Sequence, residues 1–312
     1  MRLMRIRSRS LATLLLAIWL GGCCPGEQVD ERGWPNTLVL GQVPMLEAEM
    51  LVDNLDPLTD HLERELGIPV RSFVPMDYTG LVEAMGAGRA DIGMLPPFAA
   101  MLGMRRYDLE PILIAVRDGE IGYRTQWLTN DPNVCDAPPE PDENGMLFCQ
   151  GDIAQVRGAT VAFTDPNSTS GYLFPALQLL DSGIDPEADV RGLYVGGHDA
   201  AVLAVRAGDV RFGVSYEDAR RMVRAQYPDV GQRVIRFNHA PMIPNDGVTL
   251  RPGLPEDLRT ALIAAFISLE AAQQHLPQEQ RVLRILYDID GFEPIAAGAY
   301  DPVAASYDRL RR

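Results

Sequence analysis

The chain has 312 residues, of which 46% are hydrophobic, and a formal net charge of −15 at pH 7. This length allows two domains of ordinary size, and the apolar content is sufficient for packed cores. The acidic balance argues against a nucleic-acid-binding protein, because phosphate backbones are bound by surfaces rich in lysine and arginine.

Residues 1–22 have the features of an export signal rather than of a folded segment. Four arginines precede an apolar stretch, residues 11–20, which is too short to span a bilayer comfortably. The stretch ends in Leu20-Gly21-Gly22-Cys23, which resembles the lipobox of bacterial lipoproteins. The resemblance implies cleavage before Cys23 and a lipid anchor on its thiol, although an ordinary signal peptide is the alternative. We expect a signal peptide over residues 1–22 and a tether over residues 23–36.

The next segment has the pattern of an α/β lobe. Apolar residues recur at helical spacing in two stretches, and short apolar runs lie between them. We expect strands at 37–41, 70–74 and 91–95, with helices at 53–66 and 78–85. Alternation of strand and helix at these lengths is typical of parallel strands with helices on both faces of the sheet.

A second α/β pattern follows. Segments 111–116 and 123–128 are expected to be strands that lead out of the first lobe. Further strands are expected at 160–163, 192–195, 212–214 and 234–237, and helices at 172–180, 199–206, 217–226 and 255–275. The tail from residue 280 is expected to be mostly helical, with a break at Gly291. The chain must cross twice between lobes, so lobe 1 should comprise residues 37–122 and 243–312, and lobe 2 residues 123–242.

Residues 130–150 interrupt the second lobe with a segment rich in proline, aspartate and asparagine. Cys135 and Cys149 lie within it, and an exported protein is in an oxidising compartment. We expect these two cysteines to form a disulfide that closes a loop of about 15 residues. A metal site is disfavoured, because neither cysteine has a nearby histidine or second cysteine pair.

The sequence Asp165-Pro166-Asn167-Ser168-Thr169-Ser170-Gly171 follows an expected strand and opens an expected helix. The first amides of a helix have no intrahelical partner and bear positive partial charge, so they suit an anion. Clustered hydroxyls add donors without adding charge. Plain helix capping by Ser168 or Thr169 remains an equal alternative. Pro175 is costly if the helix starts as early as Ser168.

The run from residue 164 to residue 175 resembles the signature of the phosphate/phosphite/phosphonate-binding proteins of ABC importers. Other segments resemble the same family in the same order, namely Asp77-Tyr78, 91–98, Arg117-Asp118-Gly119, 197–200, 216–219, 243–246 and 287–292. The similarity covers about residues 37–304. It implies a two-lobed α/β periplasmic-binding-protein fold, type II-like, in which each lobe is a mixed, mostly parallel sheet flanked by helices and the ligand lies in the hinge cleft.

The resemblance also implies which residues bind the ligand. By position, Ser168, Thr169 and Ser170 would hold the oxyanion, and His198 would donate from the same lobe. From the first lobe, Tyr78 and Phe98 would close the site, with Phe98 supplying only an apolar wall. Capping of a turn is the alternative role for His198. The insertion at 130–150 does not belong to the family pattern.

Three acidic residues and a tyrosine each fit two alternative roles. Glu217, Asp218 and Asp246 would suit the ammonium of an aminoalkylphosphonate, whereas phosphite or phosphate would be repelled by carboxylates placed close by. They are otherwise solvated acids at helix starts. Tyr216 is expected to contact the ligand. For both Tyr216 and Tyr123, the alternative to lining the cleft is packing within the lobe.

The implied function is capture of a small phosphorus oxyanion by hinge closure, outside the cytoplasmic membrane, with no cofactor. The implied partners are the ABC permease and ATPase subunits, since this chain has no Walker motif, and a monomer is expected. One alternative is an oxyanion-sensing lipoprotein that signals to another protein. Another is a hydrolase using Ser170, His198 and Asp218, although the Gly-x-Ser-x-Gly elbow is absent.

Overall fold

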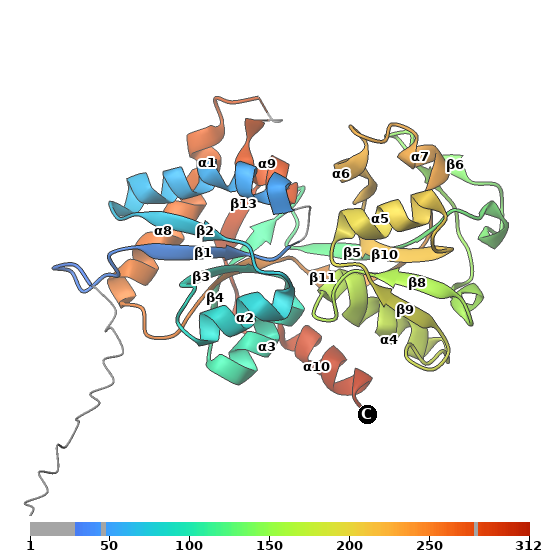
Figure 1. The fold of residues 1–312 in the computed structure, drawn as a ribbon, viewed down its shortest axis with the longest axis horizontal. Coiled ribbons are helices and arrows are strands. Elements are labelled where there is room, and N and C mark those ends of the chain that lie inside the picture. The colour runs from blue at the N-terminus through green and yellow to red at the C-terminus, as the bar shows by residue number, and fades with distance from the viewer. Residues whose placement is uncertain (1–28, 45–47, 278–279) are drawn as a thin grey trace, which may run out of the picture.

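The structure is a computed structural model that describes residues 29–44, 48–277 and 280–312. The expected signal peptide, Cys23 and most of the expected tether lie outside these ranges. Within them, no helix combines the length and the apolar character needed to cross a membrane. Two lobes lie side by side, each built on one sheet (Figure 1).

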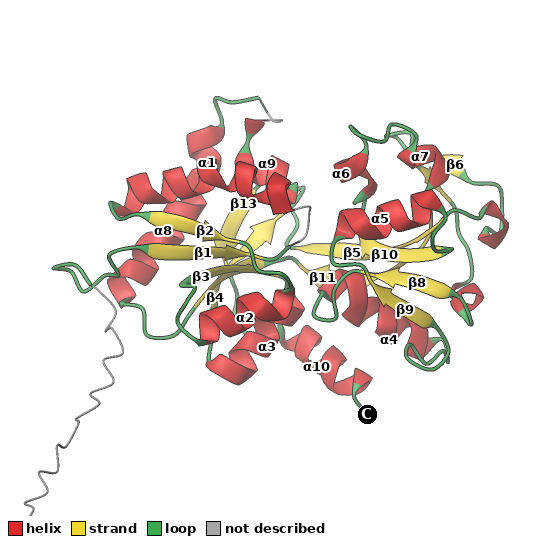
Figure 2. Ribbon diagram, viewed as in Figure 1, coloured by secondary structure: helices red, strands yellow, loops and turns green. Residues whose placement is uncertain are grey.

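Lobe 1 contains a six-stranded sheet in the order β13-β4-β12-β3-β1-β2. Its strands are β1 (Leu38–Gln42), β2 (Val70–Phe73), β3 (Ile92–Leu95), β4 (Glu110–Val116), β12 (Gly247–Leu250) and β13 (Gly291–Pro294). Its helices are α1 (Ala48–Leu66), α2 (Tyr78–Gly86), α3 (Pro97–Tyr107), α8 (Glu256–Gln273), α9 (Val282–Tyr287) and α10 (Asp301–Leu310). Helices cover both faces of the sheet (Figure 2), with α1 and α8 packed over one apolar core and α2 and α3 over another.

Lobe 2 contains a seven-stranded sheet in the order β6-β7-β11-β5-β10-β8-β9. Its strands are β5 (Gly122–Thr129), β6 (Glu140–Pro141), β7 (Leu147–Phe148), β8 (Thr160–Phe163), β9 (Arg191–Tyr194), β10 (Phe212–Tyr216) and β11 (Ile235–Pro244). Its helices are α4 (Phe174–Asp181), α5 (His198–Ala207), α6 (Arg220–Val223) and α7 (Val230–Arg233), with one-turn helices η1 (Pro132–Val134), η2 (Ile153–Val156) and η3 (Thr169–Leu173).

The predicted fold class is confirmed, with mixed pairing in both sheets. In the described residues β1 pairs in parallel with β2 and β3, and β8 with β9 and β10. Antiparallel pairs involve β12 and β4 in lobe 1 and β5 and β11 in lobe 2. These are the strands beside the two crossings, β4 to β5 and β11 to β12. A strand that leaves one lobe and another that returns run in opposite directions, so the pairing is less parallel than the strand–helix alternation indicates.

Two expected elements differ in the structure. The helix expected at 217–226 is reduced to the four residues of α6, because Asp218 has a left-handed φ of 63° and residues 217–219 form a turn. The expected helical tail contains a strand, β13, which pairs antiparallel with β4. Its four residues are too few for periodicity to identify as a strand, and partner β4 is far away in sequence.

The expected disulfide between Cys135 and Cys149 is present, with a Cα–Cα distance of 5.7 Å. Both cysteines pack against the core of lobe 2. The insertion is therefore not a free loop: β6 pairs with β7, and β7 pairs with β11 at the edge of the sheet.

We expect the double substitution Cys135→Ala, Cys149→Ala to lower the free energy of unfolding by about 3 kcal/mol, because the unfolded chain regains the entropy of an open loop. Chemical denaturation of both proteins would measure it. Single substitution of either cysteine should give the same loss relative to the oxidised parent protein, because each removes the crosslink. An unchanged denaturation midpoint in the double variant would show that the crosslink adds no stability.

Candidate functional site

The hydroxyl-rich segment of lobe 2 forms the one-turn η3 before α4 begins at Phe174. Ser168 is the N-cap of η3, and its Oγ accepts a hydrogen bond from the Gly171 amide at 3.0 Å. The turn has π geometry and delays the α-helix, so Pro175 lies in the first turn of α4, where its missing N–H costs nothing. By position, the amides of Thr169 and Ser170 have no partner within the helix.

Gly171 is required by close packing against the preceding strand end. A Cβ built at this glycine would lie 1.8 Å from Oγ1 of Thr164. The Thr164 amide donates to the Gly171 carbonyl at 3.2 Å, which fixes the start of η3 against the end of β8. The segment therefore presents its first amides and hydroxyls in a fixed direction, toward lobe 1.

A small cavity of about 30 Å³ lies between the lobes in front of this segment. On the same measure a single water needs roughly 10–15 Å³. Its lining includes polar side chains from both lobes and both crossings: Tyr78, Arg117, Tyr123, Ser168, Ser170, His198, Tyr216, Asn245 and Asp246. The rest of its lining is apolar: Val43, Met94, Pro96, Ala115, Ile289 and Phe292. The cavity is thus a mostly enclosed site in which polar groups and an apolar wall surround the space for a small ligand.

His198 contributes a neutral hydrogen-bonding group to the cavity. It is the first residue of α5, and its Nδ1 lies 2.8 Å from Oγ of Ser215. Burial, together with the charge of Arg117, lowers the pKa of His198 to about 3. The imidazole is therefore uncharged at neutral pH, and if Nδ1 accepts from the Ser215 hydroxyl, Nε2–H is the donor available to a ligand.

Asp246 is the acid that the structure places at the cavity. It follows β11 at the second crossing, and its Oδ1 is buried without a hydrogen-bond partner. Burial raises the pKa of Asp246 to about 6, against the opposing effects of the Arg117 charge and the Tyr123 hydroxyl. A buried carboxylate with an open acceptor position suits a ligand group that donates a proton or hydrogen bond.

Three polar cavity residues, Arg117, Tyr123 and Asn245, are not assigned to ligand binding by the sequence. Arg117, in the first crossing, lies 5.6 Å from the ring centroid of Tyr123 and 5.4 Å from that of Tyr216, and its Nε donates to the Asp288 carbonyl at 3.1 Å. Tyr123 donates to Oγ of Ser170 at 3.2 Å. The Arg117-Asp118-Gly119 segment belongs to the family pattern, but which of its side chains faces the cleft depends on the path of the crossing.

Thr169 and Phe98 do not line the cavity. Oγ1 of Thr169 accepts a hydrogen bond from the Phe98 amide at 2.9 Å. The Phe98 ring packs in an apolar cluster between the lobes and lies 5.1 Å from the Tyr307 ring. Both residues lie beside the site and join the lobes, instead of facing the ligand position as the resemblance implies.

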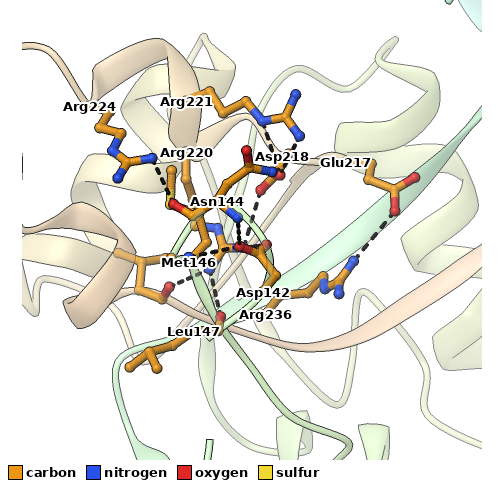
Figure 3. Close-up of polar contacts among 12 residues, drawn as sticks. Asp142, Asn144, Met146, Leu147, Glu217, Asp218, Arg220, Arg221, Arg224 and Arg236 are labelled. Atoms are coloured by element: carbon orange, nitrogen blue, oxygen red, sulfur yellow. Dashed lines mark hydrogen bonds and ion pairs between the residues drawn. The ribbon is translucent and has the colours of Figure 1, made fainter. Parts of the chain in front are cut away.

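Glu217 and Asp218 also lie outside the cavity, in the group of polar side chains that Figure 3 shows. Glu217 lies 3.4 Å from Arg236, and Asp218 pairs with Arg220 at 3.1 Å and Arg221 at 3.0 Å. Both acids therefore already have cationic partners. The hydrolase arrangement is not formed, because His198 is bonded to Ser215 and Asp218 to two arginines.

The family model described as "ABC transporter, phosphonate, periplasmic substrate-binding protein" matches residues 40–300. The phosphate-import protein PhnD of Mycolicibacterium smegmatis is 30% identical over 223 residues, covering 68% of this chain and 65% of that protein. The phosphonates-binding periplasmic protein of Escherichia coli is 24% identical over 244 residues, covering 78% and 67%. The matches thus span about two thirds of these relatives.

Solved structures share the fold at lower identity. A binding-protein component of an ABC phosphonate transporter from Pseudomonas aeruginosa has a TM-score of 0.73 and 21% identity, covering 88% of this chain and 86% of that one. PhnD1 of Prochlorococcus marinus, in complex with methylphosphonate, has a TM-score of 0.73 and 17% identity, covering 88% and 98%. The alkanesulfonate-binding protein SsuA of Xanthomonas axonopodis pv. citri has a TM-score of 0.59 and 16% identity, covering 89% and 94%.

The predicted family and the prediction that the chain is not an enzyme are confirmed by these matches. The fold alone does not separate phosphonate from sulfonate binding, because both kinds of protein share it. The family model, which covers most of the chain, makes that distinction. The protein belongs to the family of periplasmic phosphonate substrate-binding proteins of ABC transporters.

Proposed function

We propose that this protein captures a small phosphorus oxyanion in the cavity between its lobes and delivers it to the permease of an ABC importer. The observation that carries this proposal is the enclosed cavity between the lobes, where the hydroxyls of Ser168 and Ser170 at the start of η3 lie opposite Tyr78 of the other lobe. Amides at a helix start and neutral hydroxyls match the several acceptor oxygens of a phosphonate, phosphite or phosphate.

The ligand must also donate a hydrogen bond to the buried Asp246 carboxyl, and this requirement restricts the class of ligand. Its open Oδ1 accepts a hydrogen bond from a protonated ligand oxygen, or from an ammonium group. Because the cavity is only about 30 Å³ and Glu217 and Asp218 are paired elsewhere, we favour a small monoprotonated oxyanion over an aminoalkylphosphonate. Sulfate and sulfonates have no proton to donate at neutral pH, so the same carboxylate disfavours them.

Export, the lipid anchor at Cys23 and the monomeric state belong to this proposal. The relatives' family is periplasmic, and Leu20-Gly21-Gly22-Cys23 supports anchoring to a bacterial membrane. Loss of labelled fatty acid in a Cys23→Ala variant would test the anchor. A protein that signals in place of importing would use the same ligand site. Binding to a permease would distinguish the import function from the signalling function.

We expect Ser170→Ala to weaken ligand binding roughly 10- to 150-fold, because a hydrogen bond to a charged ligand contributes about 1.5–3 kcal/mol. Calorimetric titration with methylphosphonate, phosphite and phosphate measures the loss. Thr160→Ala, on the same lobe but outside the cavity, serves as the control and should bind as the parent protein does. Equal affinity of the Ser170→Ala variant would remove this hydroxyl from the site.

A further inference from the structure

Helix α3 of lobe 1 has no side-chain cap of its own. Its N-cap residue is Pro96, which has no side-chain oxygen, and Pro97 in the first helical position has no N–H. The first amide of the helix that can donate is that of Phe98. Its acceptor is Oγ1 of Thr169 in lobe 2, at 2.9 Å, and the bond is buried. The cap of this helix is therefore supplied by the opposite lobe.

Helix α2 of lobe 1 receives a second contact of the same kind. Its own N-cap, Asp77, accepts from the Gly80 amide at 2.7 Å. The Tyr78 amide donates instead to Oδ2 of Asp165 in lobe 2, at 3.3 Å. Beside it, Nδ2 of Asn167 donates to Oγ1 of Thr79 at 2.7 Å.

One loop of lobe 2 thus makes three polar contacts with the first turns of two helices of lobe 1. An apolar contact runs beside them: Phe98 and Met101 of α3 pack with Leu173, Leu177 and Val303 in one buried cluster. In Figure 1, α10, which contributes Val303, lies between α3 and α4. All of these contacts join protein groups of one lobe to protein groups of the other, so they stabilise the closed arrangement directly.

We propose that the side chains of Asp165, Asn167 and Thr169 form a latch that holds the lobes closed by contacting the first turns of α2 and α3, and that these side chains position the lobes rather than contact the ligand. The latch makes the unliganded protein spend a substantial fraction of its time closed. It raises apparent ligand affinity, because affinity scales with the fraction of molecules in the binding-competent form. The effect on affinity rests on the proposed function; the effect on closure does not.

The test is amide hydrogen exchange of the unliganded protein, resolved to single residues by NMR, because opening exposes latch amides to solvent. In each variant, exchange is measured at a latch amide whose hydrogen-bond acceptor has not been substituted, so a faster rate reports opening of the lobes. Thr169→Val keeps the side-chain shape but leaves the Phe98 amide unsatisfied only in the closed form. The Tyr78 amide, which donates a hydrogen bond to Asp165, is the reporter for this variant. We expect its exchange to become about tenfold faster, because losing the Thr169 hydrogen bond destabilises the closed form by about 1.4 kcal/mol.

A second variant guards against a folding defect. Asn167 is partly exposed, and Asn167→Ala removes its contact with Thr79 only; the Phe98 amide should exchange faster, by a smaller factor than in Thr169→Val. Thr169→Ser retains the acceptor and should restore parental exchange. Thr160→Ala is the matched control, since the Thr160 hydroxyl accepts a hydrogen bond from Nε of Arg191 within lobe 2 and lies outside the latch and the cavity, and it should leave both reporter amides as in the parent. Amides of β1 should not change in any variant.

Two results would overturn the latch. One is unprotected exchange of the Tyr78 and Phe98 amides in the parent protein without ligand. The other is unaltered Tyr78 exchange in Thr169→Val together with unaltered Phe98 exchange in Asn167→Ala. Failure of phosphite, phosphate and methylphosphonate to bind, with the expected exchange in the unliganded variants, would reject the proposed ligand and leave the latch supported.

Discussion

Replacing Arg220 by methionine is expected to lower the free energy of unfolding by about 3–5 kcal/mol. Arg220 is fully buried, and its guanidinium donates to the carbonyls of Leu147, at 2.6 Å, and Val234, at 2.8 Å. It also pairs with Asp218 at 3.1 Å. Methionine fills a similar volume but leaves two buried carbonyls without these donors, and each such loss costs about 1–3 kcal/mol.

The affected contacts join three parts of lobe 2: β7 in the insertion, the turn before α6, and Val234 just before β11. Figure 3 shows Arg220 with the first two, Leu147 and Asp218. Loss of Arg220 should therefore loosen the insertion first. Chemical denaturation measures the total loss. The matched control is Arg221→Met, because Arg221 pairs with the same carboxylate but its side chain is 48% exposed. Exposed pairs contribute about 0–1 kcal/mol, so equal losses in the two variants would contradict this account.

The substitution Asp246→Asn is expected to weaken ligand binding by about 2–5 kcal/mol, the usual cost of truncating one partner of a buried charged hydrogen bond. The same variant should be more stable than the parent without ligand. The native pKa of Asp246 is raised to about 6, so the native state loses stability relative to the unfolded state as pH rises from about 4 through about 6. Asparagine removes that cost, which is roughly 1–3 kcal/mol at pH 7.5.

The sign of this pH dependence separates the site from an ordinary ion pair. A carboxylate stabilised by a cation has a lowered pKa and supports folding above it, whereas Asp246 opposes folding above pH 6. Denaturation of the parent and Asp246→Asn proteins at pH 4.5 and 7.5 should show a difference that is larger at pH 7.5. Glu217→Gln, outside the cavity, should change neither ligand affinity nor this difference. Tighter binding of phosphite or phosphate to Asp246→Asn would contradict the assigned role.

Much of the fold is predictable because its signals are local. The helical spacing before Leu66 and the helix stop at Gly67 predict α1 and its end, and the expected range 78–85 nearly coincides with α2 (Tyr78–Gly86). What is missed depends on distant partners. Strand β12 becomes a strand by pairing with β3 and β4, which lie more than a hundred residues earlier in the chain.

The site divides in the same way. Ser168, Ser170 and His198 belong to a recognisable motif, and the cavity contains all three. The direction of Thr169 depends on the π geometry of η3, which turns its hydroxyl toward Phe98, and sequence spacing does not reveal that geometry. The positions of the acidic residues are the least predictable from sequence, because they depend on the path of the backbone. Asp218 is turned away from the cavity by a left-handed φ, and Asp246 faces the cavity because it lies in the second crossing.

The most direct test of the central claim is calorimetric titration of ligand-free protein with phosphite, phosphate, methylphosphonate, 2-aminoethylphosphonate and sulfate. The account predicts tight binding of at least one of the first three and no detectable binding of sulfate. A preference for 2-aminoethylphosphonate would keep the family function but assign an ammonium group to Asp246. Binding of none of the phosphorus oxyanions by demonstrably folded protein, or equal binding of sulfate, would contradict the claim that this cavity captures a small monoprotonated phosphorus oxyanion.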